Sequence, residues 1–164
     1  LFEEVPKLGI LSPVSLKWGN DCPKDRKLFP MFLLPLVCYM FRKECLDGLI
    51  SGTDYYDYLF SARENFRSYD LDTEICIKAY INDFMFCVTN EILIYEDEGL
   101  IYNNTQETKT ESKELHRSLM FKEGMKFLME TYGFRNKNEM RAWGQQEILN
   151  FFQRNTDAKK VFYL

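Results

Sequence analysis

Three successive acids, Glu96, Asp97 and Glu98, stand directly before Gly99 near the middle of the chain. A calcium loop of the EF-hand type spreads its oxygen ligands over about 12 residues, whereas the side chains of consecutive residues in a tight turn diverge. The run therefore does not predict a calcium cage, and its negative charge would repel the phosphates of a nucleic acid. It predicts a solvated turn or a surface that faces a basic protein, so these three acids are candidate protein-interface residues.

Other acids could in principle bind a catalytic metal ion, and they are Asp54, Asp57, Asp70, Asp72 and Glu74. Carboxylates from different parts of a chain pair around Mg²⁺ or Mn²⁺ in metal-dependent nucleases. Each of these acids, however, stands near the predicted start of a helix, where a carboxylate interacts favourably with the helix dipole. Their positions at helix starts explain these acids without a metal ion, and a metal-dependent nuclease is the alternative function.

Histidine chemistry has little basis here, because His116 is the single histidine of the chain. Ser112 lies four residues earlier on the same face of a predicted helix, but a Ser–His pair also needs an orienting carboxylate and an oxyanion hole, which no residue pattern marks. No glycine-rich loop resembles a Walker A motif or a dinucleotide fingerprint. The sequence predicts a protein that is not an enzyme, with no catalytic residue, no cofactor and no metal ligand.

The net charge of −4 provides no general field that would attract nucleic acid. Short basic groups are still weak candidates for a DNA contact, namely Lys24, Arg26, Lys27, Arg135 and Lys137. Arg42 with Lys43 is a further basic pair. Such short groups are more typical of a solvated face than of a phosphate-binding surface.

The five cysteines include no CxxC pair, and most of them stand in apolar runs, where a free thiol behaves as a small hydrophobe. This usage is typical of a reducing compartment. The most apolar stretch, residues 28–41, is shorter than the roughly 20 residues of a membrane-spanning helix, and Pro30 and Pro35 interrupt it. We therefore expect a cytoplasmic protein without membrane contact.

Aromatic residues give the main positive indication of function, because they make up 16% of the chain and its tyrosines exceed what one helical face can bury. Tyrosine and tryptophan are enriched in protein interfaces. The aromatic interface candidates are Tyr55, Tyr56, Tyr58, Trp143, Phe162 and Tyr163. Their number favours a module that binds another protein.

The predicted organisation is an irregular, proline-containing lead-in over residues 1–30 and a single helical domain over residues 31–164. Apolar spacings and capping residues predict helices over 35–46, 53–66, 70–88, 112–132 and 138–154. Between them, the sequence predicts a β-hairpin over 92–102 and a polar loop over 103–114. The predicted fold class is therefore mainly α with a small β-hairpin, a winged-helix-like helical domain.

The order of residues 33–37, 92–95, 100–102 and 122–128 resembles a known family. It is similar to the small middle component of bacterial three-component ABC ATPase systems, which include the Lamassu-type antiviral complexes. The similarity is one of pattern and spans roughly residues 30–150.

This resemblance implies a non-catalytic adaptor subunit that docks on a large coiled-coil, SMC-like ABC ATPase and bridges it to an effector nuclease. The context would be defence against phage or plasmid DNA, with DNA reached through the complex. Two alternatives remain open from the residues alone. One is a standalone winged-helix DNA-binding protein, and the other is a small inhibitor or immunity protein that binds one protein partner.

Overall fold

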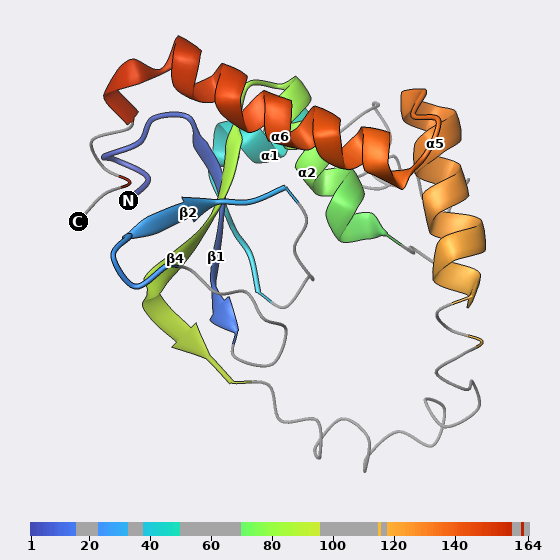
Figure 1. The fold of residues 1–164 in the computed structure, drawn as a ribbon. Helices are drawn as coiled ribbons and strands as arrows, with labels where there is room; N and C mark the ends of the chain where they lie inside the picture. Colours follow the sequence, from blue (N-terminus) through green and yellow to red (C-terminus); the bar gives the residue numbers. More distant parts are fainter. Residues whose placement is uncertain are drawn as a thin grey trace.

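A four-stranded mixed sheet forms the centre of the computed structural model, which describes residues 1–15, 23–32, 38–49, 70–95, 115, 118–158 and 162 (Figure 1). Its strands are β1 (Leu8–Ser15), β2 (Leu28–Pro30), β3 (Met40–Phe41) and β4 (Met85–Ile94), in the spatial order β2-β4-β1-β3. The central strands β1 and β4 run parallel, and the two short edge strands pair with them antiparallel. The protein has an α+β fold, so the predicted mainly α, winged-helix-like domain is wrong.

Strand β1 lies within the segment 1–30 that was predicted to be an irregular lead-in, so that prediction is also wrong. All eight residues of β1 are buried. A strand that is covered on both faces shows no alternation of apolar and polar residues, and the usual period-two pattern is missing. Pro13 added a turn signal, yet it stands opposite Thr89 in the parallel pairing.

The predicted helix over 70–88 is correct only in its first part, which forms α2 (Leu71–Ile81). The chain turns at Asp83, whose φ of 58° lies in the left-handed region, and β4 begins at Met85. Residues 85–88 were assigned to the helix because their apolar side chains also fit a helical spacing. A continuous apolar run of this length is equally typical of a buried strand, and the structure has the strand.

Other predicted elements are partly revised. Ile92 to Ile94, expected in a hairpin, form the end of β4 and pair with β1 instead, through Val14 and Ser15. The rest of the predicted hairpin and the loop 103–114 lie outside the described residues, as does the helix predicted over 53–66. The helix predicted over 35–46 is displaced, because residues 40 and 41 form β3 and α1 spans Lys43–Leu49.

The two C-terminal helices were predicted correctly as far as the structure describes them. A π-helical segment η2 (Met120–Met125) continues into α5 (Lys126–Tyr132), which ends at Gly133 with a φ of 78°. Helix α6 (Lys137–Arg154) begins at Asn136, whose side-chain oxygen accepts hydrogen bonds from the N–H groups of Asn138 and Glu139 at 3.0 Å each. A short 3-10 turn η3 (Thr156–Ala158) follows. In these described segments, no helix combines the length and the apolar character needed to cross a membrane.

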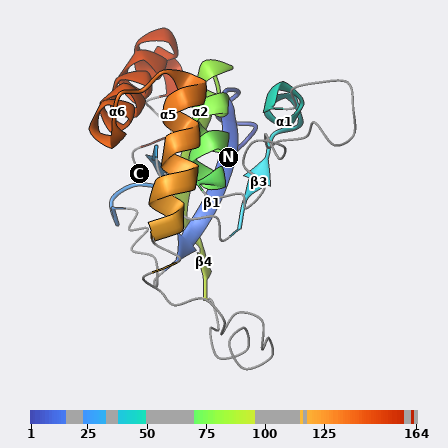
Figure 2. The ribbon, with the colours of Figure 1, turned by 90° about the vertical axis from the view of Figure 1, so that its right-hand side faces the viewer.

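Helices α1 and α6 lie on opposite sides of the central strand β1 (Figure 2). The approach of α1 depends on Gly9 of β1, since a Cβ atom at this position would lie 2.6 Å from both Cys45 Sγ and Phe84 Cβ. No side chain fits in that space. Cys45 itself is fully buried, and this burial raises the pKa of its thiol to about 12. Cys76 and Cys87 are buried as well, which confirms that these cysteines act as small hydrophobes.

A contact between Phe32 and Gly144 holds α6 against the sheet. A Cβ atom at Gly144 would lie 2.1 Å from Phe32 Cγ, so the ring rests directly on the helix backbone. The same ring packs against Trp143 at 5.6 Å and Tyr80 at 6.1 Å between centroids. The Tyr80 hydroxyl donates a hydrogen bond of 2.7 Å to the carbonyl oxygen of Met31. The segment after β2 therefore links α2, α6 and the sheet.

Replacing Gly144 with Ala should destabilise the fold by about 1–2 kcal/mol. Overpacking a core typically costs about 1–3 kcal/mol, and the upper part of that range, about 2–3 kcal/mol, applies here because the new Cβ would overlap a ring that also packs against Trp143 and Tyr80. The preference of alanine over glycine in a helix offsets about 1 kcal/mol of this cost. Urea denaturation measures the change, with Gln145→Ala on the exposed face of α6 as the matched control. In the double variant with Phe32→Ala, the changes in the free energy of unfolding should be strongly non-additive. A Gly144→Ala variant as stable as the wild type would contradict the packing described.

Candidate functional site

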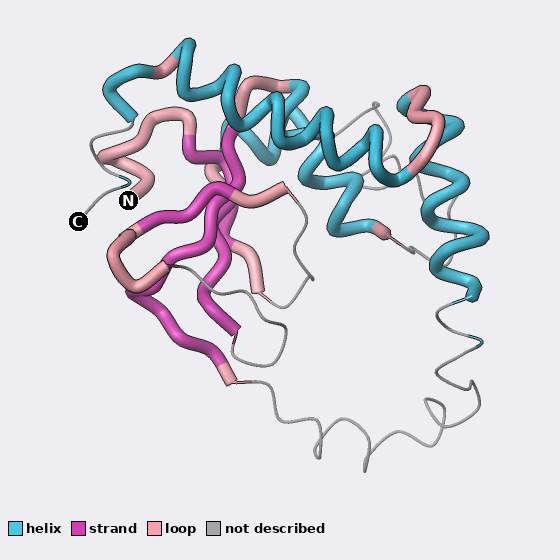
Figure 3. The backbone as a smooth tube through the Cα atoms, in the orientation of Figure 1, coloured by secondary structure: helices cyan, strands magenta, loops and turns pink. Residues whose placement is uncertain are grey.

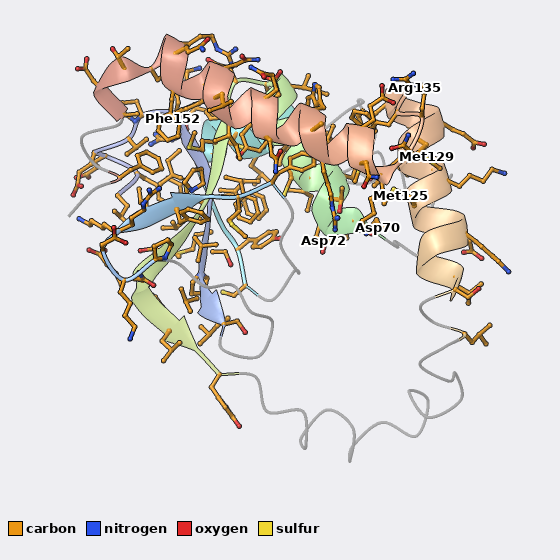
Figure 4. The ribbon with its side chains drawn as sticks, in the orientation of Figure 1. Asp70, Asp72, Met125, Met129, Arg135 and Phe152 are labelled. Carbon is orange, nitrogen blue, oxygen red and sulfur yellow. The ribbon has the colours of Figure 1, made fainter. Side chains whose placement is uncertain are left out.

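The acids at the start of α2 do not form a metal centre. Figure 4 shows Asp70 and Asp72 at this helix start. Asp70 has a left-handed φ of 57° and makes no capping hydrogen bond with its side chain, contrary to the expectation that it caps the helix. Burial, reinforced by the charge of Asp72, raises the pKa of Asp70 to about 6, although Lys137 acts in the opposite direction. Burial also raises the pKa of Asp72.

Glu74 takes part in a different interaction from those two acids. It is 1% exposed, its carboxylate lies 3.2 Å from Lys78 Nζ, and it accepts a hydrogen bond of 3.3 Å from the Tyr132 hydroxyl. The ion pair lies within α2, and the hydrogen bond from Tyr132 joins α2 to α5. In the part of the chain that the structure describes, no group of three His, Cys, Asp or Glu residues could bind a metal ion, and Asp54 and Asp57 lie outside that part.

The basic residues singled out from the sequence are engaged mainly with acids or rings of the fold. Lys27 Nζ lies 3.4 Å from the carboxylates of both Glu4 and Glu91, and the hydrogen bond to Glu91 is the main cause that raises the pKa of Lys27. The guanidinium group of Arg26 lies over the Phe29 ring at 5.6 Å. Lys24, in the same turn, is exposed.

At the start of α6, Arg135 forms a forked ion pair with Glu139, with N–O distances of 2.9 and 3.1 Å. Arg135 lies at the opposite end of this helix from Phe152 (Figure 4). Lys137 follows it and counteracts the charge of Asp70. The candidate DNA contacts thus stand on two different elements, the turn before β2 and the start of α6. This arrangement does not give one continuous basic surface within the described residues.

Arg42, part of another basic pair in the sequence, ties the N-terminal turn to the sheet. Its Nε atom donates a hydrogen bond of 2.9 Å to the carbonyl oxygen of Leu8. Its Nη2 atom donates to the carbonyl oxygen of Val5 at 3.2 Å and also to the carbonyl oxygen of Phe2. The neighbouring Lys43 is exposed and pairs with Asp47. Arg42 therefore has a structural role.

Two of the aromatic candidates pack against other rings of the fold. Trp143 is half-buried, and its ring lies 5.6 Å from the rings of both Phe32 and Phe134. Phe162 is 2% exposed and lies 5.0 Å from the Phe152 ring. Phe162 is therefore not available as an anchor for a partner, whereas Trp143 keeps part of its surface exposed. The other aromatic candidates, Tyr55, Tyr56, Tyr58 and Tyr163, lie outside the described residues.

An exposed apolar surface lies instead at the C-terminal end of β4. Ile92, Leu93 and Tyr95 are 44%, 61% and 85% exposed, and we call these three side chains the strand-end patch. The first five residues of β4 are buried, whereas Asn90 to Leu93 are exposed. Figure 3 shows this end of the strand projecting from the sheet. Glu96, Asp97 and Glu98 follow directly in the sequence and lie outside the described residues.

Sequence reasoning placed Ile92 to Tyr95 in a strand but did not identify the exposure of their side chains. The signal was a change in composition within the strand, from the apolar Met-Phe-Cys-Val of residues 85–88 to the polar Thr-Asn-Glu of 89–91. Polar residues in mid-strand indicate where it leaves the core. On that pattern, the apolar residues that follow them lie outside the core and indicate an exposed surface.

Comparisons of the chain with protein-family models, with curated proteins and with solved structures found no match in any of the three.

Replacing Asp70 with Asn should raise the free energy of unfolding at pH 7 by about 1 kcal/mol. A rise in pKa from 3.8 to about 6 corresponds to about 3 kcal/mol, which we reduce because the carboxyl group is only partly buried. The folded-state pKa lies above the unfolded one, so the contribution of the neutral carboxyl is complete below pH 3.8 and is lost as the pH rises through about 6.

The gain should therefore be present at pH 7 and absent at pH 3.5–4. Urea denaturation at both pH values measures it, and Asp25→Asn, at an exposed acid, serves as the control. An equal effect of Asp70→Asn at both pH values would contradict the assignment.

Proposed function

We propose that the protein is a non-catalytic adaptor that binds a protein partner through the strand-end patch. The observation that carries this proposal is the exposure of Ile92 and Leu93 at the end of β4 and of Tyr95 directly after it. Singly exposed apolar residues are ordinary, but a group of them bordered by charged residues is typical of an interaction site. Tyrosine is also one of the residues that most often contribute strongly to binding.

The placement of the polar groups supports a non-catalytic role. Glu74 is used in an ion pair within α2 and a hydrogen bond to α5, Arg135 in a forked pair with Glu139, and Arg42 in holding main-chain carbonyls. A catalytic site would instead need such groups to converge on a space where a substrate could bind. Their engagement in holding the fold together favours a binding protein.

The resemblance in residue pattern to the middle component of three-component ABC ATPase systems suggests the partner. We propose a large coiled-coil, SMC-like ABC ATPase as this partner, with an effector nuclease as a further subunit and defence against phage or plasmid DNA as the context. A standalone winged-helix DNA-binding role is not proposed, because the fold is α+β. An inhibitor or immunity protein would use the same patch on a different partner.

Purification of the chain from its native cells tests the adaptor function. The wild type should retain one ATPase partner in stoichiometric amount. The Leu93→Glu variant should retain at least about tenfold less of this partner, because a buried, unpaired carboxylate opposes binding. Leu149→Glu on α6 is the matched control, since Leu149 is 56% exposed and Leu93 is 61% exposed. Quantitative mass spectrometry of the retained proteins gives the result, and circular dichroism verifies the fold of each variant.

Three outcomes would change the proposal. Equal retention by Leu93→Glu and the wild type would contradict the role of the strand-end patch. A stable, partner-free monomer under native expression would contradict the adaptor function itself. A stoichiometric partner other than an ABC ATPase, lost in Leu93→Glu, would replace the ATPase with the target of an inhibitor or immunity protein.

A further inference from the structure

Strand β4 contains a bulge in its pairing with β1. Pro13 of β1 stands opposite Thr89, and the next residue of β1, Val14, stands opposite Leu93. Residues 90–92 are therefore an insertion on the β4 side, and we call them the β4 bulge. The bulge lies where β4 changes from buried to exposed residues. Bulges commonly redirect the side chains of a strand near a functional surface.

The bulge keeps polar side chains away from the buried end of β1. Val14 and Ser15, the last two residues of β1, are 9% and 1% exposed. Without the bulge, the pairing would place Asn90 and Glu91 opposite these two residues. Burying an amide or a carboxylate beside them would cost free energy. With the bulge, two apolar residues of β4 stand at these positions instead, and the polar ones lie outside the core.

The turn formed by residues 23–27 holds the bulge in place. Asn90 Nδ2 donates hydrogen bonds to the carbonyl oxygens of Pro23, at 2.8 Å, and Arg26, at 3.0 Å. Within the turn, the N–H of Arg26 donates to the carbonyl oxygen of Pro23 at 2.9 Å. The side-chain amide of Asn90 therefore joins the bulge to both ends of one ordered turn.

Thr89 and Lys27 secure the same bulge from its inner side. Thr89 Oγ1 donates a hydrogen bond of 3.1 Å to the carbonyl oxygen of Lys27 and accepts one of 3.2 Å from the N–H of Glu91. Lys27 Nζ lies 3.4 Å from the carboxylates of both Glu91 and Glu4. The main chain and the side chain of Glu91 are thus both engaged by neighbouring groups.

The strand-end patch begins inside this anchored segment. Ile92 is the last residue of the β4 bulge, and Leu93 is the first residue after it. Both side chains are exposed. A surface that is already held in its binding conformation loses less conformational entropy when a partner binds. The contacts that hold the bulge therefore also affect the affinity of the patch.

We infer that Asn90 is a positioning residue of the strand-end patch, because its hydrogen bonds to the turn 23–27 hold the β4 bulge that presents Ile92 and Leu93 to the protein partner. This inference rests on the proposed adaptor function and specifies how its binding surface is held. Asn90 acts through the bulge and not through a contact of its own with the partner.

Replacing Asn90 with Ala tests this role. In the native purification described above, Asn90→Ala should retain about tenfold less of the ATPase partner than the wild type, because the bulge is no longer anchored. Asn82→Ala is the matched control. Asn82 is also exposed, and its Nδ2 atom also donates to two carbonyl oxygens, those of Gly48 at 3.1 Å and Lys78 at 2.8 Å. Urea denaturation should therefore show similar losses of stability for the two variants, whereas partner retention should fall only in Asn90→Ala.

Hydrogen–deuterium exchange of the purified chain measures the bulge without any partner. The N–H of Glu91 is bonded to Thr89 Oγ1 within the anchored segment, so it should exchange about tenfold faster in Asn90→Ala than in the wild type. Asn82→Ala should leave the exchange of this amide unchanged.

Unchanged exchange at Glu91 in Asn90→Ala would overturn the inference, and so would an equal loss of the partner in Asn82→Ala, since stability alone would then explain the effect. Loss of the partner in Leu93→Glu with full retention in Asn90→Ala would reject the positioning role and leave the adaptor function standing. A wild type that retains no partner would reject the function and the inference together, so the two failures are distinguishable.

Discussion

The parallel pairing of β1 with β4 is the constraint on which the rest of the structure depends. Seven residue pairs join the two strands, from Leu8 with Met85 to Ser15 with Ile94. Parallel neighbours need a long connection that passes over the sheet, and such strands are normally covered on both faces. In this chain the connection includes α1 and α2, and α1 and α6 lie on opposite sides of β1 (Figure 2). Gly9 and Gly144 provide the close approaches that this covering requires.

The charged residues mostly secure the borders of this arrangement. Arg42 holds the carbonyl groups of the turn before β1, and Glu74 with Lys78 joins α2 to Tyr132 of α5. Asp83, in the turn between α2 and β4, lies 2.9 Å from Arg154 of α6 and 3.5 Å from Lys7. These groups are committed to the fold, whereas Ile92 and Leu93 at the end of β4 and Tyr95 after it are exposed.

The sequence was sufficient for elements whose pattern is local. Helices α5 and α6 have clear starts or stops, such as Asn136 before α6 and Gly133 after α5, and these ends were predicted within a few residues. For α2 only the start was predicted correctly. The sheet was missed because its central strands are buried on both faces and carry no alternation. Whether β1 pairs with β4 depends on contacts between residues that are more than 70 positions apart in the chain. No local sequence pattern encodes such contacts.

The candidate site was predicted only in part, for a related reason. Ile92 to Ile94 were correctly placed in a strand, but an apolar residue type does not distinguish a side chain that faces the core from one that faces a partner. Trp143 and Phe162 were assigned to an interface on their residue type; packing against Phe152 buries Phe162, and packing against Phe32 and Phe134 covers part of Trp143. Residue type indicates how much apolar surface a chain must cover, and the tertiary fold determines where.

Site-specific photo-crosslinking tests the central claim, that the end of β4 is the surface on which the partner binds. A photoreactive phenylalanine derivative replaces Leu93 in one sample and Leu149 in another, two positions of similar exposure, and each complex is irradiated and digested. The account predicts cross-links from position 93 to one short segment of the partner and none from position 149. Cross-links from position 149 with none from position 93 would contradict it.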